Sequence, residues 1–491
     1  MTWEATWNVL LVLALAAIAI GLLLLLLTLP STYSHQQPRF INENFFTPED
    51  KKDAQKSGYN YYLQHRDSNG HYRVDTSIQI VVLGDIGRSP RMQYHALSLA
   101  AHGASVDMIG YAGAEVHPDI LRSRFITLVP ITPLPPLLQG GNKFTFLLLA
   151  PLKVLWQILS LYYTLAYTTN PSKWMLIQNP PSIPTLAIAQ TISFLRSTRL
   201  VIDWHNFGYS ILALRLGPHH PLVRLSELYE GFFSRHRVHA HFAVTNAMCR
   251  VLKSKWDIDA LPLHDRPADI FQPLSGALRT RLLERLPGTA AHAADILAGR
   301  TRLVVSSTSW TPDEDFSVLL AALVHYSTLV DSDPNLPNIV AIITGRGPQR
   351  SHYLQQIQHL TATSQLAHCI VTTAWLSPFD YALLLGSADL GVSLHTSSSG
   401  VDLPMKVVDM FGTGLPVAGW SKFEAWPELV QEGVNGLGFE SAEGLRDVLV
   451  EVFGGEGERL FELRRGAMRE VERRWGDEWM PVAGRLFQLR S

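Results

Sequence analysis

Apolar runs alternate with amphipathic stretches along most of the chain, which divides it into strand and helix units. The runs at 78–83 and 105–111 flank the stretch 84–103, which begins with a glycine-punctuated turn and continues as a helix. Further apolar runs at 174–178 and 200–203 extend the series. Parallel strands joined by helices build doubly wound sheets, whose ligands bind beyond the carboxyl ends of the strands. The pattern therefore predicts an α/β fold with ligand-binding loops after its strands.

A second series of the same kind fills the C-terminal half, with strands predicted at 302–306, 339–344 and 368–372. At 491 residues the chain is too long for one compact core, so two domains are expected. We predict five parts: a transmembrane anchor (1–34), a tether (35–76), an N-terminal doubly wound domain (77–262), a C-terminal doubly wound domain (263–474), and a helical segment (475–491) that could pack back on the N-terminal domain.

The most informative pattern lies at 388–420, which reads as strand, loop, helix and strand. Three serines and a glycine form the loop, and Asp402 with Pro404 supplies residue types that open a helix. The helix has one apolar face and one charged face, which carries Lys406 and Asp409. Such a loop and helix N-terminus suit a phosphate, although an ordinary amphipathic helix covering a sheet fits the pattern equally well.

Two strand ends in the first domain carry further polar candidates. Gly84 and Gly87 form a G-x-x-G turn, which is not the full dinucleotide fingerprint, and Arg88 follows. An acceptor phosphate and a plain tight turn are both open readings of it. Asp203 and His205 stand just past another predicted strand, where a histidine can be functional or structural.

Two segments suggest contact with a membrane. Residues 9–29 contain no charge and match the length of about 20 residues that spans a bilayer. The flanking residues favour an uncleaved anchor over a signal peptide, and Arg39 and Lys51 downstream place the larger part in the cytosol. For 144–167, which contains Pro151 and a lysine, we prefer a helix lying on the membrane; a second span and a buried core helix are the alternatives.

Composition narrows the range of partners. A formal net charge of −2 provides no basic field, so we expect no nucleic-acid partner. The two cysteines, Cys249 and Cys369, cannot build a disulfide framework. No cluster of histidines and carboxylates has metal-ligand spacing, so no metal-ligating residues are predicted and the need for a divalent metal is left open.

Six ordered blocks resemble one known family: GDIGRSPRMQYHALSLA, VIDWHNFGYS, HFAVTNAMCRVL, SSTSWTPDEDFSVLL, TGRGP and SLHTSSSGVDLPMKVVDMFG. Together they are similar to the chitobiosyldiphosphodolichol β-mannosyltransferases. The resemblance implies a GT-B glycosyltransferase, in which two Rossmann-like domains face a cleft, with an N-terminal transmembrane helix. It also implies single-pass residence in the endoplasmic reticulum membrane, with both domains on the cytosolic face.

The same resemblance implies inverting transfer of mannose from GDP-mannose to dolichyl-diphosphate-linked chitobiose, with no tightly bound cofactor. Other lipid-linked oligosaccharide glycosyltransferases are possible partners. Two rival readings remain: a lipid-linked glycosyltransferase with a different nucleotide sugar, and a catalytically silent paralogue that binds a glycosyltransferase.

Residue by residue, the resemblance assigns donor binding to Gly345, Arg346, Ser398, Ser399, Gly400, Asp402 and Lys406. Asp409 stands near the second acidic position of the E-x7-E motif of related enzymes, whereas Val401 occupies the first. Many relatives place Arg and Lys in the loop at 306–315, where this chain has neither, so Lys406, Arg346 and the helix dipole, or Arg266, must neutralise the diphosphate. The acceptor side falls on Gly84, Gly87 and Arg88, and Asp85, Asp203 and His205 are the candidate catalytic bases.

Overall fold

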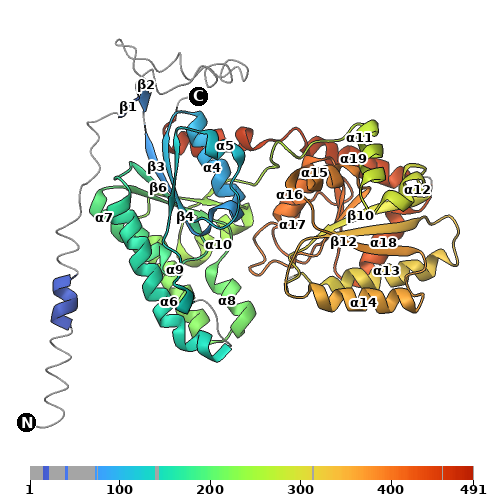
Figure 1. Ribbon diagram of the computed structural model, residues 1–491, viewed down its shortest axis with the longest axis horizontal. Helices are drawn as coiled ribbons and strands as arrows, with labels where there is room; N and C mark the ends of the chain where they lie inside the picture. Colours follow the sequence, from blue (N-terminus) through green and yellow to red (C-terminus); the bar gives the residue numbers. More distant parts are fainter. Residues whose placement is uncertain are drawn as a thin grey trace, which may run out of the picture. The chain divides into compact units, whose positions relative to one another are not determined.

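The structure is a computed structural model that describes residues 15–21, 39–41, 72–74, 76–138, 143–311, 314–455 and 457–489. The chain divides into two compact units, shown in Figure 1. The first consists of Met1–Ile202 and Leu228–Ala240, and the second of Asp203–Glu227 and His241–Leu489. The domain limits predicted from the sequence stay a prediction.

The N-terminal sheet has seven strands in the order β5-β4-β3-β6-β7-β8-β9. They are β3 (Ser77–Asp85), β4 (Ser105–Tyr111), β5 (Ile126–Pro130), β6 (Trp174–Asn179), β7 (Arg199–Trp204), β8 (Ala240–Ala243) and β9 (Leu261–Pro262). β3 pairs in parallel with both β4 and β6. The chain thus builds outward from β3 in both directions, and the order reverses beside β3. The loop after β3 therefore lies at the topological switch point, where such sheets bind ligands.

Helices connect these strands: α4 (Pro90–Ala101), α5 (Pro118–Arg122), α6 (Lys143–Tyr163), α7 (Thr185–Arg196), α8 (Gly208–Leu216), α9 (Pro221–Arg235) and α10 (Asn246–Trp256). Short turns occupy Ile86–Arg88 and Pro136–Leu138, and a π turn, Thr164–Thr168, continues α6. Arg39–Ile41 (β1) pairs with Tyr72–Val74 (β2).

Helix α6 includes most of the segment 144–167, for which the sequence allowed a helix on the membrane, a second span or a buried core helix. Leu152, Leu155, Leu159 and Tyr163 are exposed along it, whereas Leu161 is buried. The described side chains of α6 are therefore not buried on all sides, as a core helix would require. No helix within the described residues has both the length and the apolar character needed to cross a membrane. The predicted anchor at 9–29 lies mostly outside them; its described part, 15–21, is helical.

The C-terminal sheet has six strands in the order β12-β11-β10-β13-β14-β15, and every neighbouring pair is parallel. They are β10 (Thr301–Ser307), β11 (Asn338–Thr344), β12 (Cys369–Ala374), β13 (Leu390–Ser393), β14 (Val417–Trp420) and β15 (Gly436–Phe439). Its helices are α11 (Gly276–Arg285), α12 (Ala293–Leu297), α13 (Phe316–Val330), α14 (Arg350–Ala362), α15 (Pro378–Ser387), α16 (Met405–Gly412), α17 (Trp426–Leu429), α18 (Ala442–Phe453), α19 (Glu458–Glu470) and α20 (Trp475–Trp479). Ala290–His292 and Met480–Gly484 are short turns.

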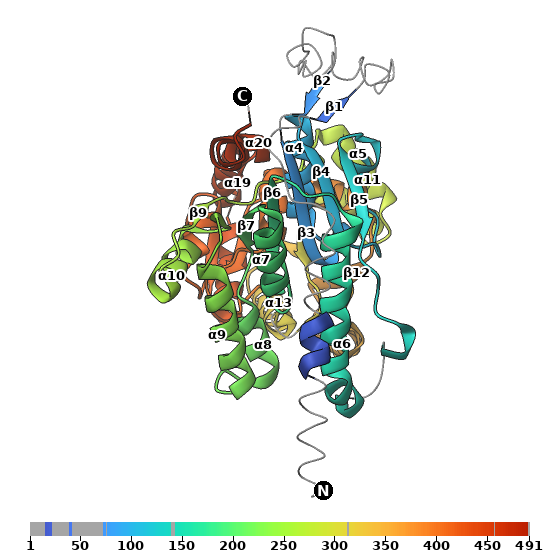
Figure 2. The ribbon, with the colours of Figure 1, turned by 90° about the vertical axis from the view of Figure 1, so that its left-hand side faces the viewer.

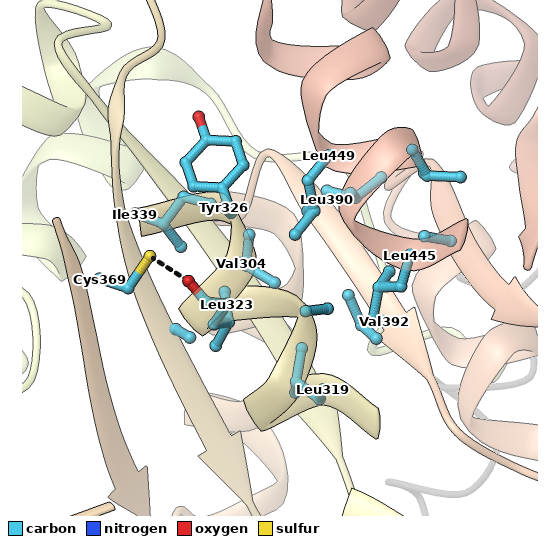
Figure 3. Close-up of a cluster of buried hydrophobic side chains, with 14 of the residues drawn as sticks. Val304, Leu319, Leu323, Tyr326, Ile339, Cys369, Leu390, Val392, Leu445 and Leu449 are labelled. Carbon is cyan, nitrogen blue, oxygen red and sulfur yellow. Dashed lines mark hydrogen bonds between the residues drawn. The ribbon is translucent and has the colours of Figure 1, made fainter. Parts of the chain in front are cut away.

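Two apolar layers hold this sheet. On one face, Val304 and Leu390 from the strands pack with Leu323 of α13 and Leu449 of α18, as Figure 3 shows. On the other face, α11, α12, α15 and α16 supply the packing side chains. The strands are apolar on both faces because helices cover both. This double packing fixes the carboxyl ends of β10, β11 and β13, from which the loops of the candidate site begin.

Candidate functional site

The serine loop, residues 396–404 between β13 and α16, folds around one carboxylate. Asp402 accepts hydrogen bonds from the Ser397 hydroxyl and from Ser399 Oγ at 3.3 Å, and its other oxygen lies 3.1 Å from His395 Nε2. Ser397 and Gly400 have positive φ angles of 48° and 76°, which tighten the loop. Burial raises the pKa of Asp402, but the hydrogen bonds and charge of His395 outweigh it, so the pKa falls below its usual value. We interpret Asp402 as the organising group of the loop.

Helix α16 begins directly after this loop. Its N-cap residue, Pro404, makes no side-chain cap hydrogen bond, so no capping side chain covers the first N–H groups of the helix. Lys406 stands at the second position, and its ammonium contacts the Glu314 carboxylate and lies 3.3 Å from Ser309 Oγ. The start of α16 thus combines helix N–H groups with a lysine, which is an arrangement suited to an anion.

Glu314 is a member of this site that the sequence reasoning missed. Its buried carboxylate accepts hydrogen bonds from Thr308 Oγ1 at 2.8 Å and from the Ser309 N–H, besides the contact with Lys406. It therefore joins the loop after β10 to helix α16. The signal in the sequence was an acidic residue in the loop 306–315, where the resemblance described above implied cations.

The loop after β11 lies directly against the loop after β10. A Cβ atom on Gly345 would stand 1.8 Å from the Thr308 carbonyl oxygen, and one on Gly347 would stand 1.7 Å from that of Ser309. The guanidinium of Arg346 stacks over the Trp375 ring at 4.0 Å. The ends of β10, β11 and β13 thereby bring Gly345, Ser309 and the serine loop to one edge of the sheet, and the assignment of this edge to the donor stays a prediction.

The residues after β7 contact the serine loop within the second unit. Asn206 Nδ2 donates to Ser398 Oγ at 3.1 Å, and Ser210 Oγ lies 3.2 Å from the same hydroxyl. Thr245 Oγ1 donates to the Val401 carbonyl at 2.6 Å while it also caps α10. Two groups that lie almost 200 residues apart in the sequence therefore form one polar cluster.

Within this cluster Asp203 and His205 form a pair. Asp203 is fully buried, and its Oδ2 lies 2.9 Å from His205 Nε2. Because Asp203 has no exposed surface, it can hold the imidazole but cannot touch a substrate in this arrangement. His205 is partly exposed, so of the two it is the group that can reach one.

Asp409 has different surroundings from Lys406, although both lie on α16. Burial raises the pKa of Asp409 well above its usual value, and the charge of Asp265 raises it further. Burial likewise raises the pKa of Tyr381, with Asp409 as a second cause. Asp409 therefore ionises less readily than an ordinary aspartate, and its place at the second acidic position of the E-x7-E motif stays a prediction.

Curated relatives cover most of the chain. A chitobiosyldiphosphodolichol beta-mannosyltransferase of Arthroderma benhamiae is 48% identical over 431 residues, 87% of this chain and 94% of the relative. The Homo sapiens protein of the same name is 42% identical over 436 residues, 83% of this chain and 92% of the relative. The chain belongs to the chitobiosyldiphosphodolichol beta-mannosyltransferase family. One Arabidopsis thaliana relative, 39% identical over 83% of this chain and 96% of its own length, is named UDP-glycosyltransferase TURAN.

Solved structures show the fold of this family member. Sucrose-phosphate synthase from Thermosynechococcus elongatus matches with a TM-score of 0.60 at 15% identity, over 84% of this chain and 98% of that one. Anabaena HepE in complex with UDP and glucose matches with 0.59 at 16%, over 84% and 100%. No family model matched the sequence. The predicted GT-B fold is confirmed, and the protein is a glycosyltransferase.

In this mannosyltransferase-family chain, the loop after β3 forms a separate hydrogen-bonded cluster within the first unit. Asp85 Oδ1 accepts hydrogen bonds from the N–H groups of Gly87 and Ala114, both at 3.1 Å. A Cβ on Gly87 would stand 2.5 Å from the Glu115 carbonyl oxygen, whereas one on Gly84 would meet only an ordinary contact at 3.6 Å. Arg88 is exposed and lies 3.5 Å from Asp85 Oδ2. Asp85 thus organises this turn.

A second unforeseen cluster surrounds His264, between Glu428 Oε2 at 3.2 Å and Glu478 Oε1 at 2.8 Å. Arg266, one of the cations considered for the diphosphate, is buried and pairs with Glu478 at 3.1 Å. Hydrogen bonds to the two glutamates raise the pKa of His264. The hydrogen bond between His264 and Glu478 in turn lowers the pKa of Glu478 to about 2. Glu428 also accepts the Ala247 N–H at the start of α10. The cluster ties α10, α17 and α20 together.

Within the described ranges, no group of three or more His, Cys, Asp or Glu side chains could hold a metal ion.

Proposed function

We propose that this protein transfers mannose from GDP-mannose to dolichyl-diphosphate-linked chitobiose, with inversion at the mannose anomeric carbon. Membership of the chitobiosyldiphosphodolichol beta-mannosyltransferase family supports mannose transfer to the lipid-linked chitobiose. The observation that carries the assignment to specific residues is the cluster in which Lys406, the serine loop and His205 share one edge of the second unit.

The donor diphosphate is held at the start of α16. Its oxygens accept hydrogen bonds from N–H groups of the helix N-terminus, and Lys406 neutralises part of the charge. Lys406 contacts Glu314 in this structure, so the diphosphate competes with that carboxylate for the ammonium. When the sugar leaves, the same groups stabilise the charge that develops on GDP.

His205 acts as the general base on the acceptor hydroxyl. Asp203 accepts a hydrogen bond from His205 Nε2–H, which leaves Nδ1 as the proton acceptor. The proton passes from the hydroxyl to Nδ1 as the oxygen attacks the anomeric carbon and the bond to GDP breaks. Asp203 then stabilises the imidazolium, as a buried carboxylate does beside a catalytic histidine. Asp85, occupied by its own loop, has no part in this step.

The enzyme works at the cytosolic face of the endoplasmic reticulum membrane. Support comes from the uncharged stretch at 9–29 as a single-pass anchor and from the row of exposed apolar side chains on α6. A helix on the surface of the bilayer can bury such a row while the rest of the domain stays in water.

A different nucleotide is the second candidate for the donor. One relative at 39% identity is named a UDP-glycosyltransferase, which favours testing UDP sugars beside GDP sugars. The purified chain is given a short-chain lipid diphosphate chitobiose with labelled GDP-mannose, UDP-N-acetylglucosamine or GDP-fucose. We expect a product one hexose heavier, from GDP-mannose alone. Transfer from a UDP sugar, or no product from folded protein, would overturn the proposal.

A further inference from the structure

Helix α9 buries polar side chains against the protein interior and exposes large apolar side chains on its outer side. Its buried side carries Val223, Ser226, Glu230 and Ser234, of which Glu230 is fully buried and accepts a hydrogen bond from Asn179 Nδ2 at 2.6 Å. Its outer side carries Leu222, Leu225, Leu228 and Phe232, which we call the α9 stripe and which are 47 to 62% exposed. A surface helix of a soluble protein normally presents the opposite arrangement.

The stripe follows helical geometry. Its four members recur at intervals of three or four residues along α9, so they lie along one side of the helix. Helix α8, which precedes α9 across a short loop, adds exposed Ile211, Leu214 and Leu216. Such an extended apolar surface marks an interaction site rather than scattered exposed side chains.

Fixed contacts hold the helix in this orientation. Lys255 of α10 reaches Tyr209 Oη of α8 at 2.8 Å and Glu227 Oε1 of α9 at 2.5 Å. On the other side, the Ala187 N–H of α7 donates to Tyr229 Oη at 3.2 Å. Figure 2 shows α9 and α7 running along the same region of the fold. Because α9 is tied to α7, α8 and α10, its stripe cannot turn inward without breaking these contacts.

The charges beside the stripe identify its occupant. Arg224 and Arg235 are exposed and fall beside the stripe on the helical wheel, and exposed Arg215 belongs to α8. Glu227 on the same helix is neutralised by Lys255. An apolar row bordered by cations fits a bilayer surface with anionic headgroups, where apolar side chains enter the acyl boundary and cations meet the headgroups.

We propose that α9, with the end of α8, lies flat on an anionic membrane surface and forms a third membrane contact, in addition to α6 and the apolar stretch at 9–29. The choice of a lipid occupant rests on the proposed function, because an acceptor carried by a polyprenyl chain requires the enzyme to work at a bilayer. The reversed polarity of α9 is independent of that function.

Labelling of the full-length protein tests the contact directly. Leu225→Cys carries an environment-sensitive fluorophore, and Phe461→Cys, on exposed Phe461 of α19, is the matched control. The protein is mixed with vesicles of phosphatidylcholine and phosphatidylserine that contain brominated lipid. We expect quenching of the label at 225 and none at 461. Equal quenching at both positions, or none at 225, would overturn the proposal, and a spectral shift that depends on protein concentration without vesicles would show a second copy as the occupant.

Activity separates the membrane contact from catalysis. The double variant Leu225→Glu and Phe232→Glu should transfer mannose to a long-chain acceptor in vesicles at least tenfold more slowly, and to a short-chain acceptor in solution at the normal rate. Phe461→Glu should change neither. Arg224→Gln and Arg235→Gln should each weaken the response to phosphatidylserine about fivefold. Equal loss with both acceptors would refute the membrane role, whereas failure of the unmodified protein on the short-chain acceptor would refute the proposed function and leave the quenching result standing.

Discussion

Replacing Lys406 by alanine removes a side-chain cation that lies at the start of α16 and contacts Glu314 and Ser309 in the loop after β10. In the folded protein this change leaves the Glu314 carboxylate with two hydrogen-bond donors, Thr308 Oγ1 and the Ser309 N–H. Breaking a fully buried ion pair costs about 3–5 kcal/mol. The lysine side chain is 30% exposed, so water compensates part of the loss and we expect about 1–2 kcal/mol of stability to disappear.

The effect on catalysis should be larger. If Lys406 stabilises the departing diphosphate, its loss removes an interaction that strengthens in the transition state, which typically costs about 10²- to 10³-fold in rate. Mannose-transfer kinetics should therefore show a fall of that size in kcat/KM, while thermal unfolding shows that the variant is folded. Lys422→Ala is the control, because Lys422 is exposed and its ion pair with exposed Glu440 is long, at 3.8 Å.

A conservative change sharpens the test. Lys406→Arg keeps the positive charge and should recover part of the lost activity, whereas Lys406→Met should not. Near-normal kcat and KM in Lys406→Ala would refute the assignment of the diphosphate to α16. A loss of activity that merely follows a loss of folded protein would reduce Lys406 to a structural partner of Glu314.

Three further outcomes are expected. Gly345→Ala should lower the free energy of unfolding by about 2 kcal/mol or more in chemical denaturation, because its Cβ would stand 1.8 Å from a carbonyl oxygen at a φ of 121°. Gly400→Ala, which has a positive φ and no neighbour within 4 Å, should cost less. His205→Ala should lower kcat about 10²- to 10⁴-fold, and an unchanged kcat would exclude it as the base. His264→Asn should lower the melting temperature relative to the unmodified protein, and the decrease should be largest between about pH 4.5 and 6.5, where His264 is protonated and Glu478 is ionised. The contribution of His264 fades as pH rises through its raised pKa, and that of Glu478 fades as pH falls toward its pKa of about 2.

The framework of both sheets could be predicted because their strands are apolar on both faces. The runs at 78–83 and 302–306 became β3 and β10, and Pro404 marked the start of α16. The serine loop could be predicted as a loop, because three serines and a glycine follow a buried strand, but the same pattern fits an ordinary turn into a helix, so its use for a phosphate could not be derived from it.

Contacts between distant residues were not predictable from local pattern. Glu314 and Lys406 are 92 positions apart, and His264 and Glu478 are 214 apart. The environment of 144–167 was undecidable because an apolar helix looks the same in sequence whether its stripe faces a core or the outside. For α9, the burial of Glu230 and the exposure of the α9 stripe together show that the apolar side faces outward.

Hydrogen exchange with and without GDP-mannose tests the location of the donor site most directly, because it reports on backbone amides rather than on a substituted side chain. The account predicts that saturating GDP-mannose slows exchange in residues 397–407 and in the loops after β10 and β11, around Ser309 and Gly345. Saturable binding that leaves these amides unchanged and protects others would contradict the assignment of the donor diphosphate to the start of α16.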